Sequence, residues 1–337
     1  SRVTCVTPYF DPHFIISPGG VMDFYNSFSS TWSPFYSDYK IKQFEIFLLK
    51  LSNKNFTDTL ISKILRFFDK DGTTISPARY CDWELSKYYL DFEHHINVMM
   101  KELQTFEYRG RWAGTESYTI KPKIQFTDYK ERQVLAVILG NFIRNCVSSL
   151  LERAGKDYFI DSDTHNFLFA KEFSELLPEI KLIHIIRDPR DVIASYIQQK
   201  GYPDKLEHSI FYYKSVMERW LSIKPNFPSK NLLEIKLENL VNNNTDIVNK
   251  ACDFIGIPLE QKMLEVDLSK SNSGRWEKEF SSDEKEILNI PFAHAEGRFI
   301  IPKILLNELK QNGQTVFRYC DPGGKTSNEF PIGLFDS

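Results

Sequence analysis

The chain has 337 residues, 42% of them hydrophobic, which is enough for one large α/β domain or two smaller ones with a substantial core. The net charge of −3 gives no sign of wholesale nucleic-acid binding, so an anion site would have to be a local basic pocket. Five scattered cysteines, an odd number, argue against a disulfide scaffold or a zinc site.

Apolar runs in the sequence are shorter than a membrane span, and no signal peptide is recognisable. We therefore expect no membrane span in this chain and a cytoplasmic location. A Golgi-lumen location would follow if an anchor upstream of Ser1 had been removed.

The N-terminal part is predicted to hold a short strand and several helices. The strand is the apolar run His13–Ser17, and Pro18-Gly-Gly20 after it is typical of a tight turn. Apolar residues at helical spacing predict helices over 21–30, 42–51, 58–68 and 82–106, with a Gly-bearing loop over 109–121. Residues 31–128 would thus form a mostly helical insertion between the first two strands.

The rest of the chain alternates helices with strands. Helices are predicted over 129–154 (ended by Gly155), 166–177, 204–224 (with Trp220 on the apolar face) and 245–256, and strands over 157–161, 182–186 and 232–236. This alternation predicts an α/β fold with a parallel sheet flanked by helices, in a single domain over residues 1–337.

The most informative stretch is Lys181–Tyr196. Its near-continuous apolar run predicts a buried parallel strand, and Arg187 stands where that strand ends. Asp188 can cap the next helix, Pro189 suits its first turn, and Ser195 lies two turns further on. Because α/β sheets bind ligands beyond the carboxyl ends of their strands, Arg187 and Ser195 can both reach one phosphate. The alternative is an ordinary strand-to-helix junction with a surface arginine.

This stretch resembles the 3′-phosphate-binding segment of the sulfotransferases that use 3′-phosphoadenosine 5′-phosphosulfate (PAPS). In that family an Arg-Asp-Pro-Arg-Asp run or a close variant ends the strand, and a serine follows eight positions after its first arginine, as Ser195 follows Arg187 here. The resemblance covers residues 157–285 well and 13–28 loosely. It implies a P-loop NTPase-like sulfotransferase fold, PAPS as cosubstrate and adenosine 3′,5′-bisphosphate as product.

The resemblance also implies a catalytic base. Cytosolic sulfotransferases carry Lys-Thr-His before this segment, with the histidine as base, and Thr164-His165 matches that form with Asp163 in place of the lysine. In extended backbone Asp163 and His165 share one face, so the carboxylate could orient the imidazole and raise its basicity. The alternative is that His165 merely caps the following helix. His184, inside an apolar strand, is predicted to be a core histidine.

A late loop in the family folds over the 3′-phosphate. Gly274-Arg275-Trp276 resembles its second half, and Lys270 falls on the lysine of its first half. Such residues on a mobile loop suit an anion lid, although a plain surface loop fits the composition equally well.

The family's first strand ends in a loop that binds the 5′-phosphosulfate through backbone amides at a helix start. The corresponding residues here depart from the family pattern, because a basic residue and two threonines are missing and Asp23 stands where a hydroxyl is expected. The loop comprises Pro18, Gly19, Gly20, Val21, Met22, Asp23 and Phe24. We expect the Asp23 carboxylate to point away from the phosphosulfate and to cap its own helix.

The sequence thus predicts sulfuryl transfer from PAPS to a hydroxyl-bearing acceptor, either a glycan or a small alcohol or phenol. Its second interpretation is a degenerate sulfotransferase fold that binds a nucleotide or glycan without transfer, favoured by the divergent loop at Gly19–Asp23. A nucleotide-dependent kinase is disfavoured because no Gly-x-x-x-x-Gly-Lys-(Ser/Thr) motif is present. No metal and no nucleic-acid partner is expected, and the sequence does not indicate an oligomeric state.

Overall fold

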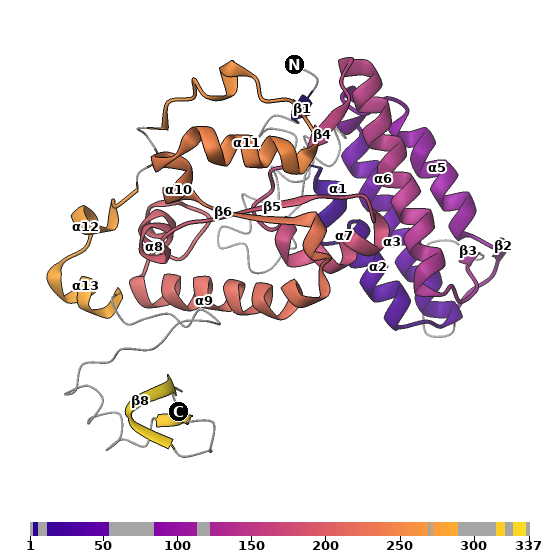
Figure 1. Ribbon diagram of the computed structural model, residues 1–337. Helices are drawn as coiled ribbons and strands as arrows, with labels where there is room; N and C mark the ends of the chain where they lie inside the picture. Colours follow the sequence, from indigo (N-terminus) through magenta and orange to yellow (C-terminus); the bar gives the residue numbers. More distant parts are fainter. Residues whose placement is uncertain are drawn as a thin grey trace, which may run out of the picture. The chain divides into compact units, whose positions relative to one another are not determined.

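The computed structural model describes residues 3–5, 12–53, 84–112, 122–268, 271, 273–288, 315–320 and 326–334. The chain forms two compact units, Ser1–Ile180 and Lys181–Ser337. The described parts of both units are mostly helical, with strands that pair two by two (Figure 1).

Unit 1 is a group of helices around an aromatic core. Its elements are β1 (Val3–Cys5), α1 (His13–Ile16), α2 (Val21–Ser30), α3 (Pro34–Ser52), η1 (Leu85–Lys87), α5 (Phe92–Leu103), β2 (Phe106–Arg109), β3 (Lys123–Phe126), α6 (Arg132–Ala154), β4 (Tyr158–Ile160), η2 (Asn166–Phe169) and α7 (Ala170–Leu176). Strands β1 and β4 are parallel, and β2 pairs antiparallel with β3.

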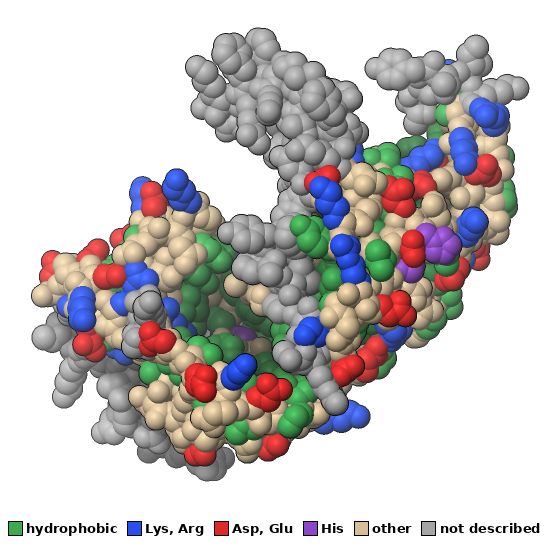
Figure 2. Space-filling model, turned by 90° about the horizontal axis from the view of Figure 1, so that it is seen from above, with side chains coloured by type: hydrophobic (Ala, Val, Ile, Leu, Met, Phe, Trp, Pro, Cys, Tyr) green, Lys and Arg blue, Asp and Glu red, His purple; other side chains and the backbone are tan. Residues whose placement is uncertain are grey.

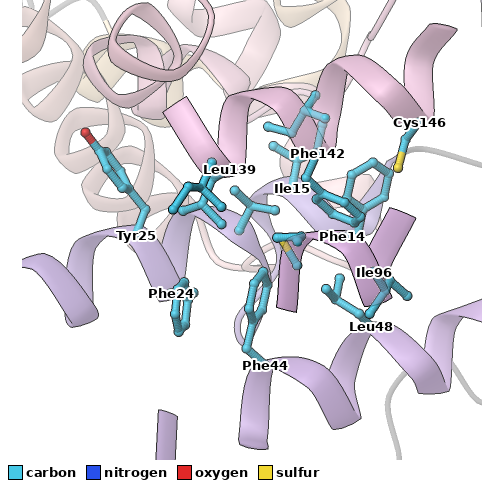
Figure 3. Packing of buried hydrophobic residues seen from close by; sticks show 14 of the residues in the cluster. Phe14, Ile15, Phe24, Tyr25, Phe44, Leu48, Ile96, Leu139, Phe142 and Cys146 are labelled. Carbon is cyan, nitrogen blue, oxygen red and sulfur yellow. The ribbon is translucent and has the colours of Figure 1, made fainter. Parts of the chain in front are cut away.

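The core of unit 1 is centred on Phe14, whose ring meets the edges of Tyr89, Phe92 and Phe142 at 5.4–5.6 Å between centroids. Figure 3 shows Phe14 from α1 lying between Phe142 of α6 and Leu48 of α3. Aromatic edge-to-face contacts add to the burial of apolar area, so this short helix is firmly held.

The sequence-based strand at His13–Ser17 is wrong, since His13–Ile16 is helical. The Ile15 amide donates to the Pro12 carbonyl at 2.8 Å, which closes a helical turn. Both Phe14 and Ile15, adjacent in sequence, are buried, whereas a strand at a surface would alternate them. An apolar run of three residues is too short for its periodicity to distinguish a helix from a strand.

Of the other predicted elements in this part of the chain, one helix is wrong in its bounds, and one helix and most of one loop cannot be compared with the structure. The helix predicted over 82–106 is broken, because Asp91 has φ 57° and separates η1 from α5. The predicted helix 58–68 and most of the loop 109–121 lie outside the described residues. The hairpin of β2 and β3 is an addition to the predicted insertion 31–128.

Helix α6 has the length and apolar composition that a membrane-crossing helix would need. In unit 1 it packs against α2, α5 and α7, and 44% of its most apolar 18 residues are buried. Gly140 makes the contact with α7 close, since a Cβ there would stand 2.2 Å from the Leu176 carbonyl oxygen. The helix is thus partly buried against its neighbours in unit 1.

Unit 2 is built on the parallel pair of β5 (Leu182–Ile186) and β6 (Leu232–Lys236). Its other elements are α8 (Pro189–Gln198), α9 (Leu206–Ile223), η3 (Lys224–Asn226), η4 (Ser229–Asn231), α10 (Leu237–Asn242), α11 (Asn244–Ile255), η5 (Gln261–Met263), α12 (Trp276–Glu279), α13 (Ser282–Leu288), β7 (Thr315–Cys320) and β8 (Thr326–Leu334). Figure 1 shows β5 and β6 between α11 and α9, so this parallel pair has helices on both faces. The predicted parallel sheet is found only in part, because the described strands form separate two-stranded pairs.

The predicted core histidine is confirmed. His184 on β5 is 8% exposed, its Nδ1 lies 3.2 Å from a Glu234 carboxylate oxygen, and its ring meets Trp220 of α9 edge to face at 5.0 Å. Burial lowers the pKa of His184 by disfavouring the charged imidazole, and this effect outweighs the opposing bond with Glu234. The histidine therefore links β5, β6 and α9.

Charges of both signs share the surface. On the face drawn in Figure 2, Lys and Arg side chains are interspersed with Asp and Glu.

Candidate active site

The junction of β5 and α8 is built as the sequence predicts. The Asp188 carboxylate accepts the Arg190 backbone N–H at 2.9 Å, and Pro189 is the first helical residue. The backbone N–H of Asp188 in turn donates to the Glu238 carboxylate at 2.8 Å. Arg187 is therefore held between a strand end and a capped helix start, where α/β folds bind ligands.

Three polar residues spaced four apart lie along one side of α8 and the residue before its cap: Arg187, Asp191 and Ser195. The Arg187 guanidinium lies 3.6 Å from an Asp191 carboxylate oxygen, and Arg187 keeps 18% of its side chain exposed. The Ser195 hydroxyl accepts a hydrogen bond from Gln199 at 2.9 Å, so its own proton remains available to a ligand oxygen.

The late loop packs against the same helix. Backbone N–H groups of Gly274 and Trp276 donate to the two Asp191 carboxylate oxygens at 2.8 and 3.1 Å. Arg190 lies 3.8 Å above the Trp276 ring, and Arg275 donates to Glu279 at 2.8 Å and to Gln198. Lys270, the other predicted ligand of this loop, lies outside the described residues.

The charge at the start of α8 is stabilised locally. Burial alone would raise the pKa of Asp188, but hydrogen bonds from Arg190 outweigh it, and the pKa falls below its usual 3.8. The same pair raises the pKa of Arg190. Both side chains are thus charged at neutral pH, and the positive charge next to Arg187 is partly neutralised.

The predicted base lies in unit 1, at the start of η2. The backbone N–H of His165 donates to the Asp163 carboxylate at 2.9 Å, while its ring Nδ1 is 3.9 Å from that oxygen and 3.3 Å from the Thr164 hydroxyl. Asp163 thus orients the backbone of His165 by a local turn and reaches its ring only weakly. With Nδ1–H directed to Thr164, Nε2 would be the atom that accepts a proton.

The predicted 5′-phosphosulfate loop is closed by internal bonds. The Gly19 N–H donates to the Asp23 carboxylate at 2.8 Å, and the Gly20 N–H donates to the Ser17 carbonyl at 2.8 Å. The Asp23 carboxylate thus binds the amide of the residue before the helix N-cap Gly20, and its predicted role as a helix cap stays a prediction. Pro18, Val21, Met22 and Phe24 complete this segment, the last three buried in the core of unit 1.

The predicted site residues fall on both units. Gly19–Phe24, Asp163 and His165 belong to unit 1, and Arg187, Ser195, Gly274 and Arg275 to unit 2, where the late loop and the α8 start do come together. Sequence reasoning missed Asp191, which joins them. Its position four residues after Arg187 was the available signal. Among the described residues, no group of three or more His, Cys, Asp or Glu is placed to hold a metal ion.

A family model described as "Sulfotransferase family" matches residues 58–261, more than half of the chain. The matched range contains His165, Arg187 and Ser195.

Individual relatives add less. The PurQ subunit of phosphoribosylformylglycinamidine synthase from Methanothrix thermoacetophila is 46% identical over 50 residues, 14% of this chain and 19% of that protein. The chain thus spans about a fifth of the length of such curated relatives, and a stretch so short shows no family.

Solved structures give weak likenesses. The sulfotransferase domain from the curacin biosynthetic pathway is 12% identical, with a TM-score of 0.35, over 68% of this chain and 78% of its own. Mouse sulfotransferase SULT7A1 in complex with PAP is 14% identical, with a TM-score of 0.29, over 42% and 67%. TM-scores at this level do not define a fold, so the family match carries the comparison.

Proposed function

Because the chain belongs to the sulfotransferase family, we propose that it transfers a sulfuryl group from PAPS to a hydroxyl acceptor, a glycan or a small alcohol or phenol. The observation that carries the proposal is the start of α8. Arg187 lies just before the helix cap and Ser195 lies on the helix, and both fall inside the range that the family model matches. A guanidinium fork and a hydroxyl donor are the groups that bind a phosphate.

The reaction would be an in-line displacement. A bond forms from the acceptor oxygen to sulfur while the bond from sulfur to the 5′-phosphate oxygen breaks, and adenosine 3′,5′-bisphosphate leaves. His165 would take the acceptor's proton at Nε2, with Thr164 and Asp163 on the other side of the ring. Arg187 and Ser195 would hold the 3′-phosphate, so positioning and charge neutralisation supply the rate enhancement.

One observation favours a second function. Two glycine amides of the predicted 5′-phosphosulfate loop, Gly19 and Gly20, already donate to Asp23 and to the Ser17 carbonyl. If these bonds persist with nucleotide bound, the chain would bind a nucleotide or glycan without transferring sulfate. Backbone amides that turn toward the ligand, with the Asp23 carboxylate released, would support the enzyme.

Binding followed by turnover separates the two functions. Calorimetry with adenosine 3′,5′-bisphosphate measures binding, and a panel of hydroxyl acceptors with labelled PAPS measures transfer. We expect both binding and transfer. Binding without transfer to any acceptor would favour the non-catalytic module, and a preference for ATP would overturn both.

A further inference from the structure

Asp191 stands out in unit 2 as a buried carboxylate. It is 1% exposed, although it lies in the first turn of α8 beside the partly exposed Arg187 and Arg190. A buried carboxylate needs hydrogen bonds or an opposite charge to offset the loss of water. Asp191 has both, from three separate groups.

Two of these groups are backbone amides of the late loop. Gly274 donates to one carboxylate oxygen and Trp276 to the other. Gly274 has φ +77°, and no atom lies within 4 Å of where a Cβ would stand, so a glycine is needed for backbone conformation rather than for space. Trp276 begins α12, and the residue before it, Arg275, makes no capping bond with its side chain. Asp191 therefore caps α12 from a neighbouring helix.

The third group is the predicted phosphate ligand. Arg187 lies 3.6 Å from the same carboxylate oxygen, Oδ2, that accepts the Gly274 N–H. One atom of Asp191 thus contacts both the arginine and the loop. The Arg190 guanidinium over the Trp276 ring adds a second link between α8 and the loop.

We propose that Asp191 is a positioning residue for the 3′-phosphate: it directs the Arg187 guanidinium and holds the turn of Gly274–Trp276 against α8, so that arginine, Ser195 and loop address one anion. The inference rests on the proposed function and deepens it. Being buried, the carboxylate does not face the phosphate, and two amides and a guanidinium balance its charge. Its contribution would appear as selectivity for nucleotides that carry a 3′-phosphate.

The test compares two ligands on the full chain. Calorimetry gives the dissociation constants of adenosine 3′,5′-bisphosphate and adenosine 5′-monophosphate for the wild type and for Asp191→Asn. The variant keeps the size of the side chain, removes its charge, and turns an amide group toward a loop N–H. We expect the bisphosphate constant to rise about tenfold or more, and that of the monophosphate to change less than about twofold.

The matched control is Asp246→Asn. Asp246 is exposed in the first turn of α11, and its carboxylate accepts a hydrogen bond from Asn243. It should leave both constants unchanged. Amide exchange over residues 273–280 gives a second readout, since release of the loop in Asp191→Asn should speed exchange there and Asp246→Asn should not.

The outcomes distinguish the inference from the function it rests on. A wild type that does not bind the bisphosphate overturns the proposed function. A folded Asp191→Asn that keeps its selectivity, or loses affinity equally for both ligands, overturns the inference alone. If that variant does not fold, Gly274→Ala decides, because its strain falls on the loop end rather than on the core. It should lose the same selectivity, and retained selectivity overturns the inference.

Discussion

At the scale of single residues, the predicted phosphate arginine is restrained before any ligand binds. Arg187 follows a strand end directly, keeps less than a fifth of its side chain exposed and is paired with Asp191. A side chain fixed in this way loses little rotamer freedom on binding, which favours affinity. Its contribution should therefore be close to that of a full charge-assisted hydrogen bond.

Arg187→Ala should weaken binding of adenosine 3′,5′-bisphosphate by about 1.5–3 kcal/mol, because a charge-assisted hydrogen bond is lost. Ser195→Ala should cost less, about 0.5–1.5 kcal/mol, since its hydroxyl is neutral. Calorimetry measures both, with Arg219→Ala on the exposed side of α9 as the control. An affinity of Arg187→Ala equal to that of the control would contradict the assignment.

His165→Ala should lower turnover about 10²-fold or more while nucleotide affinity stays near that of the wild type, because a general base acts only on the transferred proton. Steady-state transfer assays and calorimetry on the same preparations check the two parts. His208→Ala, an exposed histidine on α9, is the matched control. Retention of most activity in His165→Ala would show that another group takes the proton.

At the scale of elements, the sequence predicted best where local chemistry and burial agree. Strands β5 and β6 and helix α2 have the predicted bounds, and α8 starts at the predicted cap. The prediction failed where tertiary contacts decide, as at α1, whose three apolar residues take the structure that the rings around Phe14 allow. The break at Asp91 has no proline or glycine to announce it.

Asp188→Asn should change how stability depends on pH. The folded-state pKa of Asp188 is depressed, so its contribution is present above about pH 4 and is lost as the pH falls through the folded value. Asparagine still caps the helix but does not pair with the charge of Arg190. We expect a loss of about 0.5–1.5 kcal/mol at neutral pH and a shallower fall of stability on acidification.

Urea unfolding at about pH 7, 5 and 3 measures this difference, with Asp246→Asn as a charge-matched control. If the free energy of unfolding of Asp188→Asn falls as steeply as that of the wild type, the pair with Arg190 does not carry the effect.

Gly20→Ala should destabilise the chain by about 1–3 kcal/mol, because its Cβ would stand 2.6 Å from the Phe14 carbonyl oxygen and 2.9 Å from that of Ser17. The Phe14 oxygen belongs to the backbone of α1 and the Ser17 oxygen to the turn after it, so the clash can be relieved only if the backbone of α1 and this turn move. Gly201→Ala, where nothing lies within 4 Å, is the control and should be nearly neutral. Equal melting temperatures of the two variants would show that the turn moves at no cost in stability.

At the scale of the whole molecule, the sequence proposes residues that could bind the nucleotide but not the contacts that join them to one another. Arg187 and Ser195 are predicted from their place after a strand and on the next helix, the late loop only from the family resemblance, and the structure brings the start of α8 and that loop together. Asp191 was missed because the search for phosphate-binding residues considered basic and hydroxyl side chains, whereas a carboxylate repels a phosphate. That residues of both units share one pocket, and that 1–337 is a single domain, stay predictions.

Ligand binding should stabilise the whole chain. Adenosine 3′,5′-bisphosphate at about 100 times its dissociation constant should add about 2.7 kcal/mol to the free energy of unfolding. Adenosine 5′-monophosphate at the same concentration should add less, since it offers Arg187 no 3′-phosphate. Thermal or urea unfolding with each ligand makes the comparison. Equal stabilisation by both ligands would mean that the 3′-phosphate is not recognised.

The contact of Arg190 with Trp276 has an optical consequence. An indole under a guanidinium emits differently from one in water, because its excited-state dipole responds to nearby charge. Trp276 sits at the end of the late loop, so its emission would change whenever that loop leaves α8. The difference in fluorescence between the wild type and Trp276→Phe therefore isolates the signal of one indole among five. Trp276 is thus an intrinsic fluorescent probe at the position where closure of the late loop over a nucleotide would be observed.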